Sequence, residues 1–447
     1  MEEEKKIEEQ TNQVEEQPEK LRNVFTYKNY TLAFLGALVS NLGNILYNFA
    51  VSFYILQLTG NNAFIQGLYL AVAGIVYVVV TLFGGVISDR FHKGKIMFIC
   101  DYLKGFVLIA FTLLLMFVFQ DANSKVVVLF IIAIISNIIA AIFSPAAASL
   151  LPCIVPKKSL QQAQSYYSVM QSGLGILGVI LAGILYSVLP INTLFLIVGG
   201  CYILSGVSEM FINYERQKSD EKLTLKTVFS DIGIGVKYIF NFKPLLSLMF
   251  AILFINFFFN PITANFIPYF IVTDVAGSNY MFKDFIEPEM WNSIISIAFA
   301  VGMIIMGVIL STQQKKEHIS KGLRISFAIL VLVLSTLAVS YVIFTKGIID
   351  INTFLIIFVV GCMLVGLVVT TINIPSTTTL LTITDQDKIG KVSSVVDIGS
   401  QGLIPLSSFL AGLVLSGLES SWLLIICTSG FALITLFILF NKQVSKL

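Results

Sequence analysis

The segment Gly85-Val86-Ile87-Ser88-Asp89-Arg90-Phe91-His92-Lys93-Gly94-Lys95 connects two long apolar stretches, 63–88 and 96–119. It gathers a glycine, an acid and several basic residues, whereas almost every other loop is short and plain. Charged side chains of this kind are costly in lipid. We therefore expect this connection to have a mechanical role between two membrane-crossing segments.

Apolar stretches recur along the whole chain. Hydrophobic residues make up 56% of the 447 and charged residues only 12%, which is not the balance of a water-soluble domain. A helix needs about 20 apolar residues to cross a bilayer core of about 30 Å. Twelve segments meet this requirement: 30–58, 63–88, 96–119, 126–150, 162–189, 192–214, 244–273, 289–312, 322–345, 351–380, 390–417 and 420–441.

These stretches predict helices. A transmembrane barrel has alternating segments of about ten residues, and the run Val126–Ile142 does not alternate. The expected fold class is therefore an all-α integral membrane protein with twelve transmembrane helices. Residues Met1–Arg22 are rich in Glu, Lys and Gln without an apolar centre, which predicts a disordered tail and no cleavable signal peptide.

Positive charge is distributed unevenly among the predicted loops. Of the 28 Lys and Arg residues, all but four lie in the tails, the even-numbered loops with the adjoining span ends, and the central linker; the exceptions are Lys104, Lys125, Lys283 and Lys346. By the positive-inside rule, both termini are expected in the cytoplasm of a plasma-membrane protein.

Motifs for metal, nucleotide or catalysis do not occur in the sequence. The five cysteines have no Cys-x-x-Cys spacing, and His92 and His318 lie in separate predicted loops, so no metal site is expected. The sequence contains no Walker-type loop and no hydrolase motif. We expect no cofactor, no nucleic-acid partner and no enzyme activity.

A long polar break divides the spans into two sets of six. Within it, Leu223–Phe242 has apolar residues at helical spacing, which predicts an amphipathic surface helix. Pro145–Leu151 matches Pro375–Leu381, and the same alignment places Gln171 on Gln401, which indicates an internal duplication. The expected divisions are a cytoplasmic tail 1–24, a six-helix bundle 25–214, a linker 215–243, a second six-helix bundle 244–441 and a tail 442–447.

This plan resembles the major facilitator superfamily, whose two halves are related by an axis along the membrane normal. The 85–95 connection resembles that superfamily's signature between spans 2 and 3, G-x-x-x-D-R-x-G-R-R/K. Residues that match in type are Gly85, Asp89, Arg90, Lys93 and Lys95, and those that depart are His92 and Gly94.

Further motifs resemble the branch that contains macrolide-efflux proteins and the enterobactin exporter. Two features differ: the chain has Gly178–Gly183 where the family often has Gly-Pro, and span 4 lacks the buried arginine of some proton-coupled exporters. The motifs that carry the resemblance are Phe143–Ala146, Leu151–Ala163, Asp231–Ile239, Asn373–Pro375 and Gly390–Val392.

The resemblance gives the 85–95 connection the role of a latch between the two halves. Gly85 would let spans 2 and 11 approach, Asp89 would lie at the positive N-terminal end of span 11, and Arg90 would reach an acid such as Asp101. The expected latch residues are Gly85, Asp89, Arg90, Lys93, Lys95 and Asp101.

The resemblance also implies that spans 1, 4, 7 and 10 line a central cavity. Polar side chains in a membrane bundle face protein or water, and aromatic residues beside the amides would suit a bulky amphiphile. Alternatively, the amides join neighbouring helices by hydrogen bonds. The candidate cavity residues are Asn41, Asn44, Asn48, Asn137, Asn256, Asn260 and Asn373.

Charged residues within the spans are few. Asp101 and Lys104 are three positions apart, so we expect them to pair on one helical face. Asp397 has no basic residue within five positions and is the candidate for ion coupling. The alternative for Asp397 is a structural role at the end of span 11 or a pair with a base of the 85–95 connection.

Together these features predict a secondary transporter. We expect a monomer that exports a bulky amphiphile, such as a macrolide-like drug or a siderophore, by alternating access driven by an ion gradient, with protons as the expected ion. Its partners are the small-molecule substrate and membrane lipid. Two alternatives are a flippase for lysophospholipids or lipid precursors and a non-transporting membrane sensor or scaffold. An anion or sugar carrier is disfavoured, because no Arg or Lys occurs in a span expected to line the cavity.

Overall fold

The computed structural model describes residues 23–156, 159–214, 225–311, 320–383, 395, 399, 401–441 and 443. In these residues the regular structure is helical and no strand occurs. Within this described part of the chain, eleven helical segments are long and apolar enough to cross a membrane. The prediction of an all-α integral membrane fold is therefore confirmed.

The first six spans form one group of helices, here called the N bundle. Short connections start several of these helices with a side-chain cap: Asn62 accepts hydrogen bonds from the amides of Phe64 and Ile65, His92 accepts one from Lys95, and Asp121 accepts one from Ser124. After the short turn η1 (Val24–Thr26), the helices are α2 (Lys28–Leu58), α3 (Ala63–Arg90), α4 (Lys93–Phe117), α5 (Ala122–Ile154), α6 (Leu160–Val188) and α7 (Ile191–Met210).

The later spans form a second group, the C bundle. A linker helix precedes it, at the position where the sequence predicts an amphipathic helix. The elements are the linker helix α8 (Leu225–Asn241), then α9 (Lys243–Asn260), η3 (Pro261–Phe266), α10 (Ile267–Phe270), η4 (Ile271–Val275), α11 (Met290–Ser311), α12 (Ser320–Thr345), α13 (Ile351–Ile383), α15 (Ile404–Gly417) and α16 (Ser421–Phe440).

Two spans differ from their predicted form. The seventh, predicted as one segment at 244–273, is interrupted by the π-helical stretches η3 and η4. Pro261 and Pro268 lie there, and a proline inside a helix removes an amide donor and disturbs the regular ladder. The eleventh, predicted at 390–417, contains α15, while most residues before 401 lie outside the described part.

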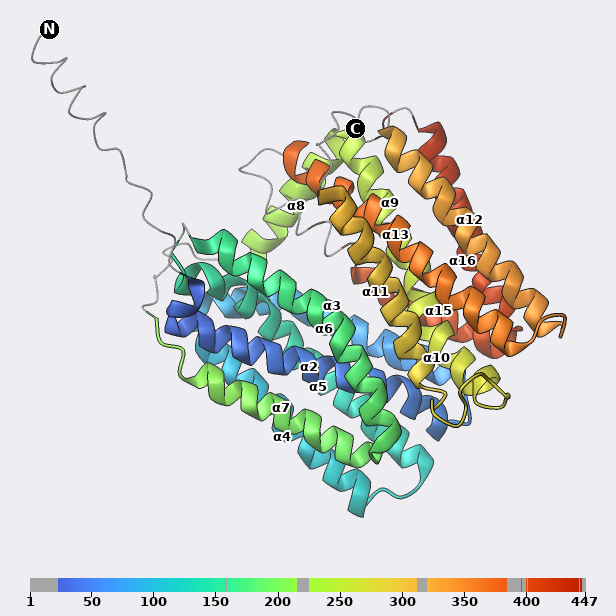
Figure 1. Ribbon diagram of the computed structural model, residues 1–447. Coiled ribbons are helices and arrows are strands. Elements are labelled where there is room, and N and C mark those ends of the chain that lie inside the picture. The colour runs from blue at the N-terminus through green and yellow to red at the C-terminus, as the bar shows by residue number, and fades with distance from the viewer. Residues whose placement is uncertain are drawn as a thin grey trace, which may run out of the picture.

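The two bundles are inclined to one another. We call the helix ends near Lys28 and Phe440 the terminal face, and those near Leu58 and Ser421 the far face. In Figure 1 the bundles converge near α10 and diverge toward the terminal face. Helix α15 lies along α3, and α11 lies along α6. The domain boundaries expected from the sequence stay a prediction.

Contacts near the far face hold the bundles together. A Cβ placed on Gly67 of α3 would lie 2.7 Å from the Cα of Gly412 on α15, so the two backbones touch. The Ser293 hydroxyl of α11 donates to the Val179 carbonyl of α6 at 2.8 Å. Small residues therefore allow α3 and α15 to approach closely, and a hydrogen bond joins α11 to α6.

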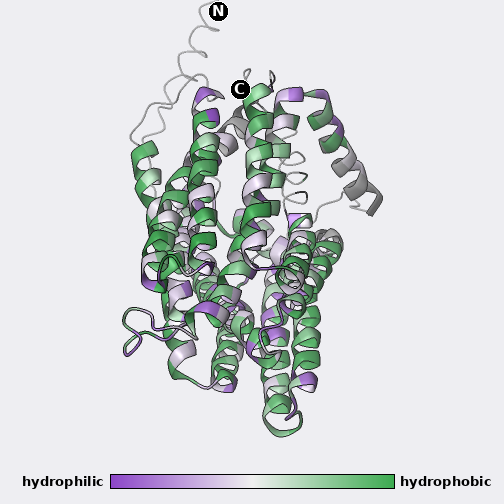
Figure 2. Ribbon diagram, turned by 90° about the vertical axis from the view of Figure 1, so that its right-hand side faces the viewer, coloured by the Kyte–Doolittle hydropathy of each residue, from purple (hydrophilic) through white to green (hydrophobic). Residues whose placement is uncertain are grey.

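Large apolar side chains cover the outer surface of the helices. Phe117, Leu177, Leu332 and Leu433 are among the most exposed of them, and Figure 2 shows apolar residues along the helices with polar residues gathered toward helix ends and turns. A soluble monomer would not expose so much contiguous apolar area. The surface fits contact with lipid.

Candidate functional site

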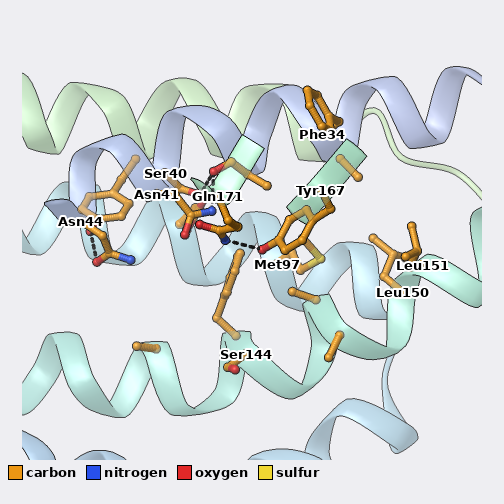
Figure 3. Close-up of a pocket in the computed structure, with 18 of the residues that line it drawn as sticks. Phe34, Ser40, Asn41, Asn44, Met97, Ser144, Leu150, Leu151, Tyr167 and Gln171 are labelled. Atoms are coloured by element: carbon orange, nitrogen blue, oxygen red, sulfur yellow. Dashed lines mark hydrogen bonds between the residues drawn. The ribbon is translucent and has the colours of Figure 1, made fainter. Parts of the chain in front are cut away.

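A cavity of about 540 Å³ lies inside the N bundle, between α2, α4, α5, α6 and α7. Tyr30 near the start of α2 and Ile154 at the end of α5 line it, so the cavity extends toward the terminal face. Figure 3 shows polar groups in it: Asn41 and Asn44 from α2, and Gln171, which donates a 3.0 Å hydrogen bond to the Tyr167 hydroxyl on α6. We call this space the polar cavity.

A second cavity of about 610 Å³ lies between α6 and the C bundle. Helices α11, α12, α13 and α16 and the seventh span contribute its mostly apolar wall, which includes Phe259, Phe299 and Phe358. We call it the apolar cavity. Gln171 lines both cavities, so they adjoin at α6.

The amide of Asn44 is the centre of a hydrogen-bond network in the polar cavity. Its Oδ1 accepts from the Lys104 ammonium at 2.9 Å and from the Tyr202 hydroxyl at 2.6 Å. The Lys104 Nζ also lies 4.3 Å from the centre of the Tyr202 ring, where the negative face of the ring attracts a cation. One side-chain oxygen thus joins α2, α4 and α7.

Two buried acids adjoin this network. Asp101 is 3% exposed and Glu209 is 0% exposed. Glu209 lies over a glycine of α2, because a Cβ placed on Gly36 would be only 2.9 Å from Glu209 Cγ. Lys104 donates to Asn44 and not to Asp101, whose Oδ2 has no hydrogen-bond partner. The hydrogen-bonded pair expected from the spacing of Asp101 and Lys104 therefore does not form in this structure.

The seven predicted cavity amides occupy different surroundings. Asn41 and Asn44 line the polar cavity. Asn260 donates to the Ser408 hydroxyl of α15 at 2.7 Å, which is a bond between helices. Asn260 and the remaining four line neither cavity: Asn137 and Asn256 bond to a carbonyl of their own helix, and Asn48 and Asn373 are exposed.

Part of the predicted latch is described. The Lys93 ammonium donates to the Ser149 carbonyl at 3.2 Å, its amide donates to the Tyr214 hydroxyl at 3.1 Å, and Lys95 is exposed. Asp101 lies in the wall of the polar cavity. The structure does not describe the surroundings of Gly85 or the side chains of Asp89 and Arg90, and Asp397 lies outside the described residues. The latch and the role of Asp397 stay predictions.

A contact at the far face joins the bundles directly. The Gln57 amide near the end of α2 donates to Glu289 Oε1 at 3.2 Å, just before α11. Burial raises the pKa of the Glu289 carboxyl above its ordinary 4.5, repulsion from Glu287 adds to this rise, and the hydrogen bond from Gln57 opposes it.

Sequence reasoning did not place Lys104, Tyr202 and Gln171 in the cavity walls. The sequence analysis expected Asp101 and Lys104 of span 3 to pair with each other and took the cavity residues from spans 1, 4, 7 and 10. The available signal was the presence of three ionisable residues, Asp101, Lys104 and Glu209, in adjoining apolar spans, because such residues usually face the bundle interior.

Comparison with known proteins agrees with this architecture. The Major Facilitator Superfamily model matches residues 33–408. The chain is 26% identical over 322 residues to the uncharacterized MFS-type transporter YkuC of Bacillus subtilis (strain 168), covering 68% of this chain and 70% of that one. It is 25% identical over 421 residues to Macrolide efflux protein A of Streptococcus pyogenes, covering 88% and 90%.

A solved structure gives the same fold at low identity. A point mutant of the nucleoside transporter NupG superposes with a TM-score of 0.70 at 11% identity, covering 92% of this chain and all of the other. Members of the matching family are multi-pass membrane transporters and not enzymes. The extent of the family match, the helical architecture and the internal cavities together assign this chain to the Major Facilitator Superfamily.

Proposed function

We propose that this transporter exports a bulky amphiphilic small molecule, such as a macrolide-like drug or a siderophore, across the plasma membrane at the expense of a proton gradient. The observation that carries the proposal is the pair of adjoining cavities. The one in the N bundle has amide and charged side chains among its apolar and aromatic lining, the one in the C bundle is lined mostly by aromatic and aliphatic groups, and Gln171 belongs to both.

The shape and chemistry of the two cavities support an amphiphilic cargo. Ligand sites of about 300–1,000 Å³ hold small molecules through apolar walls and a few polar groups, and each cavity has a volume in that range, about 540 Å³ and about 610 Å³. A polar head would bind near Asn41 and Asn44, and an apolar body near Phe299 and Phe358. The similarity to Macrolide efflux protein A supports a cargo of this size class.

The arrangement of the bundles supports loading from the cytoplasm. With the terminal face on the cytoplasmic side, as the positive-inside rule predicts, the polar cavity extends toward the cytoplasm while Gly67, Gly412 and the Gln57–Glu289 hydrogen bond hold the far face together. Release would require separation at the far face. This order of events is export by alternating access.

Purified protein in liposomes tests the proposal. We expect an imposed proton gradient to drive accumulation of at least one member of a panel of macrolides and siderophores. Gln171→Ala should reduce that transport, because both cavities lose a shared polar group, whereas Gln120→Ala, at an exposed turn after α4, should not. If neither a proton nor a sodium gradient moves any member of the panel, the proposal fails.

A further inference from the structure

The N bundle buries an unusual set of charges. Asp101 and Lys104 on α4 are 3% and 8% exposed, and Glu209 on α7 is 0% exposed. In the described part of the chain, no other charged side chain is buried to this degree. Ionisable residues at such positions in a membrane bundle are costly and usually functional.

The charges in this cluster do not balance. With all three groups ionised, two carboxylates face one ammonium. The ammonium makes its hydrogen bond to Asn44 and covers the Tyr202 ring, and Asp101 Oδ2 and both carboxylate oxygens of Glu209 have no partner. A buried carboxylate without a donor is strongly disfavoured. The cluster therefore lacks one positive charge.

We propose that Asp101 and Glu209 form a proton-binding site that couples the ion gradient to the polar cavity through Lys104 and Asn44. The inference rests on the proposed function and names the coupling site of that transporter. With one proton held as a carboxyl O–H, the cluster is neutral and Lys104 stays on Asn44. When the proton passes to a water in the polar cavity, a second carboxylate forms, and the net negative charge of the two carboxylates draws Lys104 away from Asn44.

This movement links the ion to the cargo. Asn44 holds α2 to α4 and α7 through one oxygen, and Asp101, Lys104, Asn44 and Tyr202 all line the polar cavity. Loss of the Lys104 hydrogen bond frees the Asn44 amide to bind cargo and loosens the contact between the helices. Proton release and cargo binding at the same wall are what an antiporter requires.

The surroundings favour a proton over a metal cation. The titratable groups that interact with Glu209 are Cys100 and Asp101 from α4, and Asp101 in turn interacts with Lys104 and with Tyr202 of α7. Helix α2 has no charged residue after Lys28. The Lys104 charge repels a second cation. In the described part of the chain, no group of three His, Cys, Asp or Glu residues could hold a metal ion.

Infrared titration of the cargo-free, full-length protein in detergent tests the site. A protonated buried carboxyl has a carbonyl band distinct from that of a carboxylate, and we expect one such band that disappears as the pH rises. Glu209→Gln should abolish the band, or Asp101→Asn should if the proton lies on that partner, with one fewer proton released per molecule. Lys104→Gln should raise the pH at which the band disappears. Glu287→Gln, in an exposed loop, is the matched control and should change nothing.

The outcomes separate this site from the proposed function. A band that persists both in Glu209→Gln and in Asp101→Asn, or that is abolished by Asp397→Asn instead, overturns the assignment. So does displacement of the bound proton by sodium at constant pH. In liposomes, cargo transport by Glu209→Gln with unchanged pH dependence also refutes the coupling site while the exporter stands. A Glu209-dependent band in a protein that moves no cargo keeps the proton site and refutes the exporter.

Discussion

Asn44 illustrates how one neutral side chain organises charged neighbours. Its Oδ1 accepts from Lys104 and Tyr202, so a residue without charge fixes the position of a buried ammonium. The spacing of three and four predicts one shared face for Asn41, Asn44 and Asn48; Asn41 and Asn44 line the polar cavity, whereas Asn48 is exposed. The partners of Asn44 come from α4 and α7, about 60 and 158 positions away in the sequence. A local sequence pattern therefore does not predict which amide is hydrogen-bonded.

Replacing Asn44 by Ala should destabilise the protein. The change removes a hydrogen bond to a charged group, which is worth about 1.5–3 kcal/mol, and leaves the Lys104 ammonium without this hydrogen-bond acceptor. We expect a lower thermal midpoint of the purified protein in detergent. Asn48→Ala, on the same helix but exposed, should leave the midpoint nearly unchanged; equal losses in the two variants would contradict the network.

The Glu289 contact should make stability depend on pH. The pKa of Glu289 is raised in the folded protein above its ordinary 4.5, so its contribution is fully present below that value and is lost as the pH rises through the raised pKa. We expect the thermal midpoint to fall over this interval in the wild type and to fall less in Glu289→Gln. Glu419→Gln, exposed at the far face, should behave like the wild type, and a wild-type slope in Glu289→Gln would exclude this explanation.

At the scale of helices, the apolar segments predicted most of the structure. Runs of about 20 apolar residues determine spans in a bilayer, and the described helices coincide with the predicted segments to within a few residues, except in the eleventh span, where the described helix α15 begins at Ile404. The π stretches around Pro261 and Pro268 were not predicted, because proline in a membrane helix can be accommodated by several local geometries. The contact between α3 and α15 could not be predicted from the sequence either, because at many other glycines an added Cβ would meet no neighbouring atom.

Replacement by alanine should have opposite effects on stability at two glycines, one inside the contact between α3 and α15 and one outside it. A Cβ on Gly67 would lie 2.7 Å from backbone atoms of α15, whereas one on Gly307 of α11 would meet nothing within 4 Å. Gly67→Ala should therefore cost about 1–3 kcal/mol through overpacking, and Gly307→Ala should stabilise by about 0.5–1 kcal/mol through helix propensity. Unfolding in denaturant or heat distinguishes them, and a neutral Gly67→Ala would mean that the helices separate easily there.

At the scale of the whole molecule, transport by alternating access requires the far face to open. A bifunctional thiol reagent applied to Gln57→Cys with Glu289→Cys should join the bundles and stop transport. The background should carry Cys153→Ser, because that native cysteine is exposed. Cross-linking is measured by gel mobility, and transport is measured in the same liposomes.

A second pair provides the matched control for this cross-link. Asn29 and Asn213 are joined by two hydrogen bonds within the N bundle, so linking cysteines at these positions should leave transport intact. Full activity of the Gln57–Glu289 cross-linked protein would show that the far face does not need to open. Equal inhibition by both links would point to general rigidity rather than to a gate.

The two cavities meet at α6 but draw their walls from different bundles. The charged side chains that line either cavity, Asp101 and Lys104, belong to the N bundle, and the C bundle supplies most of the wall of the apolar cavity. Under the proposed function, mutations in α11 and α13 would change which substrates bind, while the proton-binding residues of α4 and α7 would be unchanged. A chimera that takes its C bundle from a relative should, under the same proposal, acquire the relative's substrate range and retain the parent's pH dependence of transport.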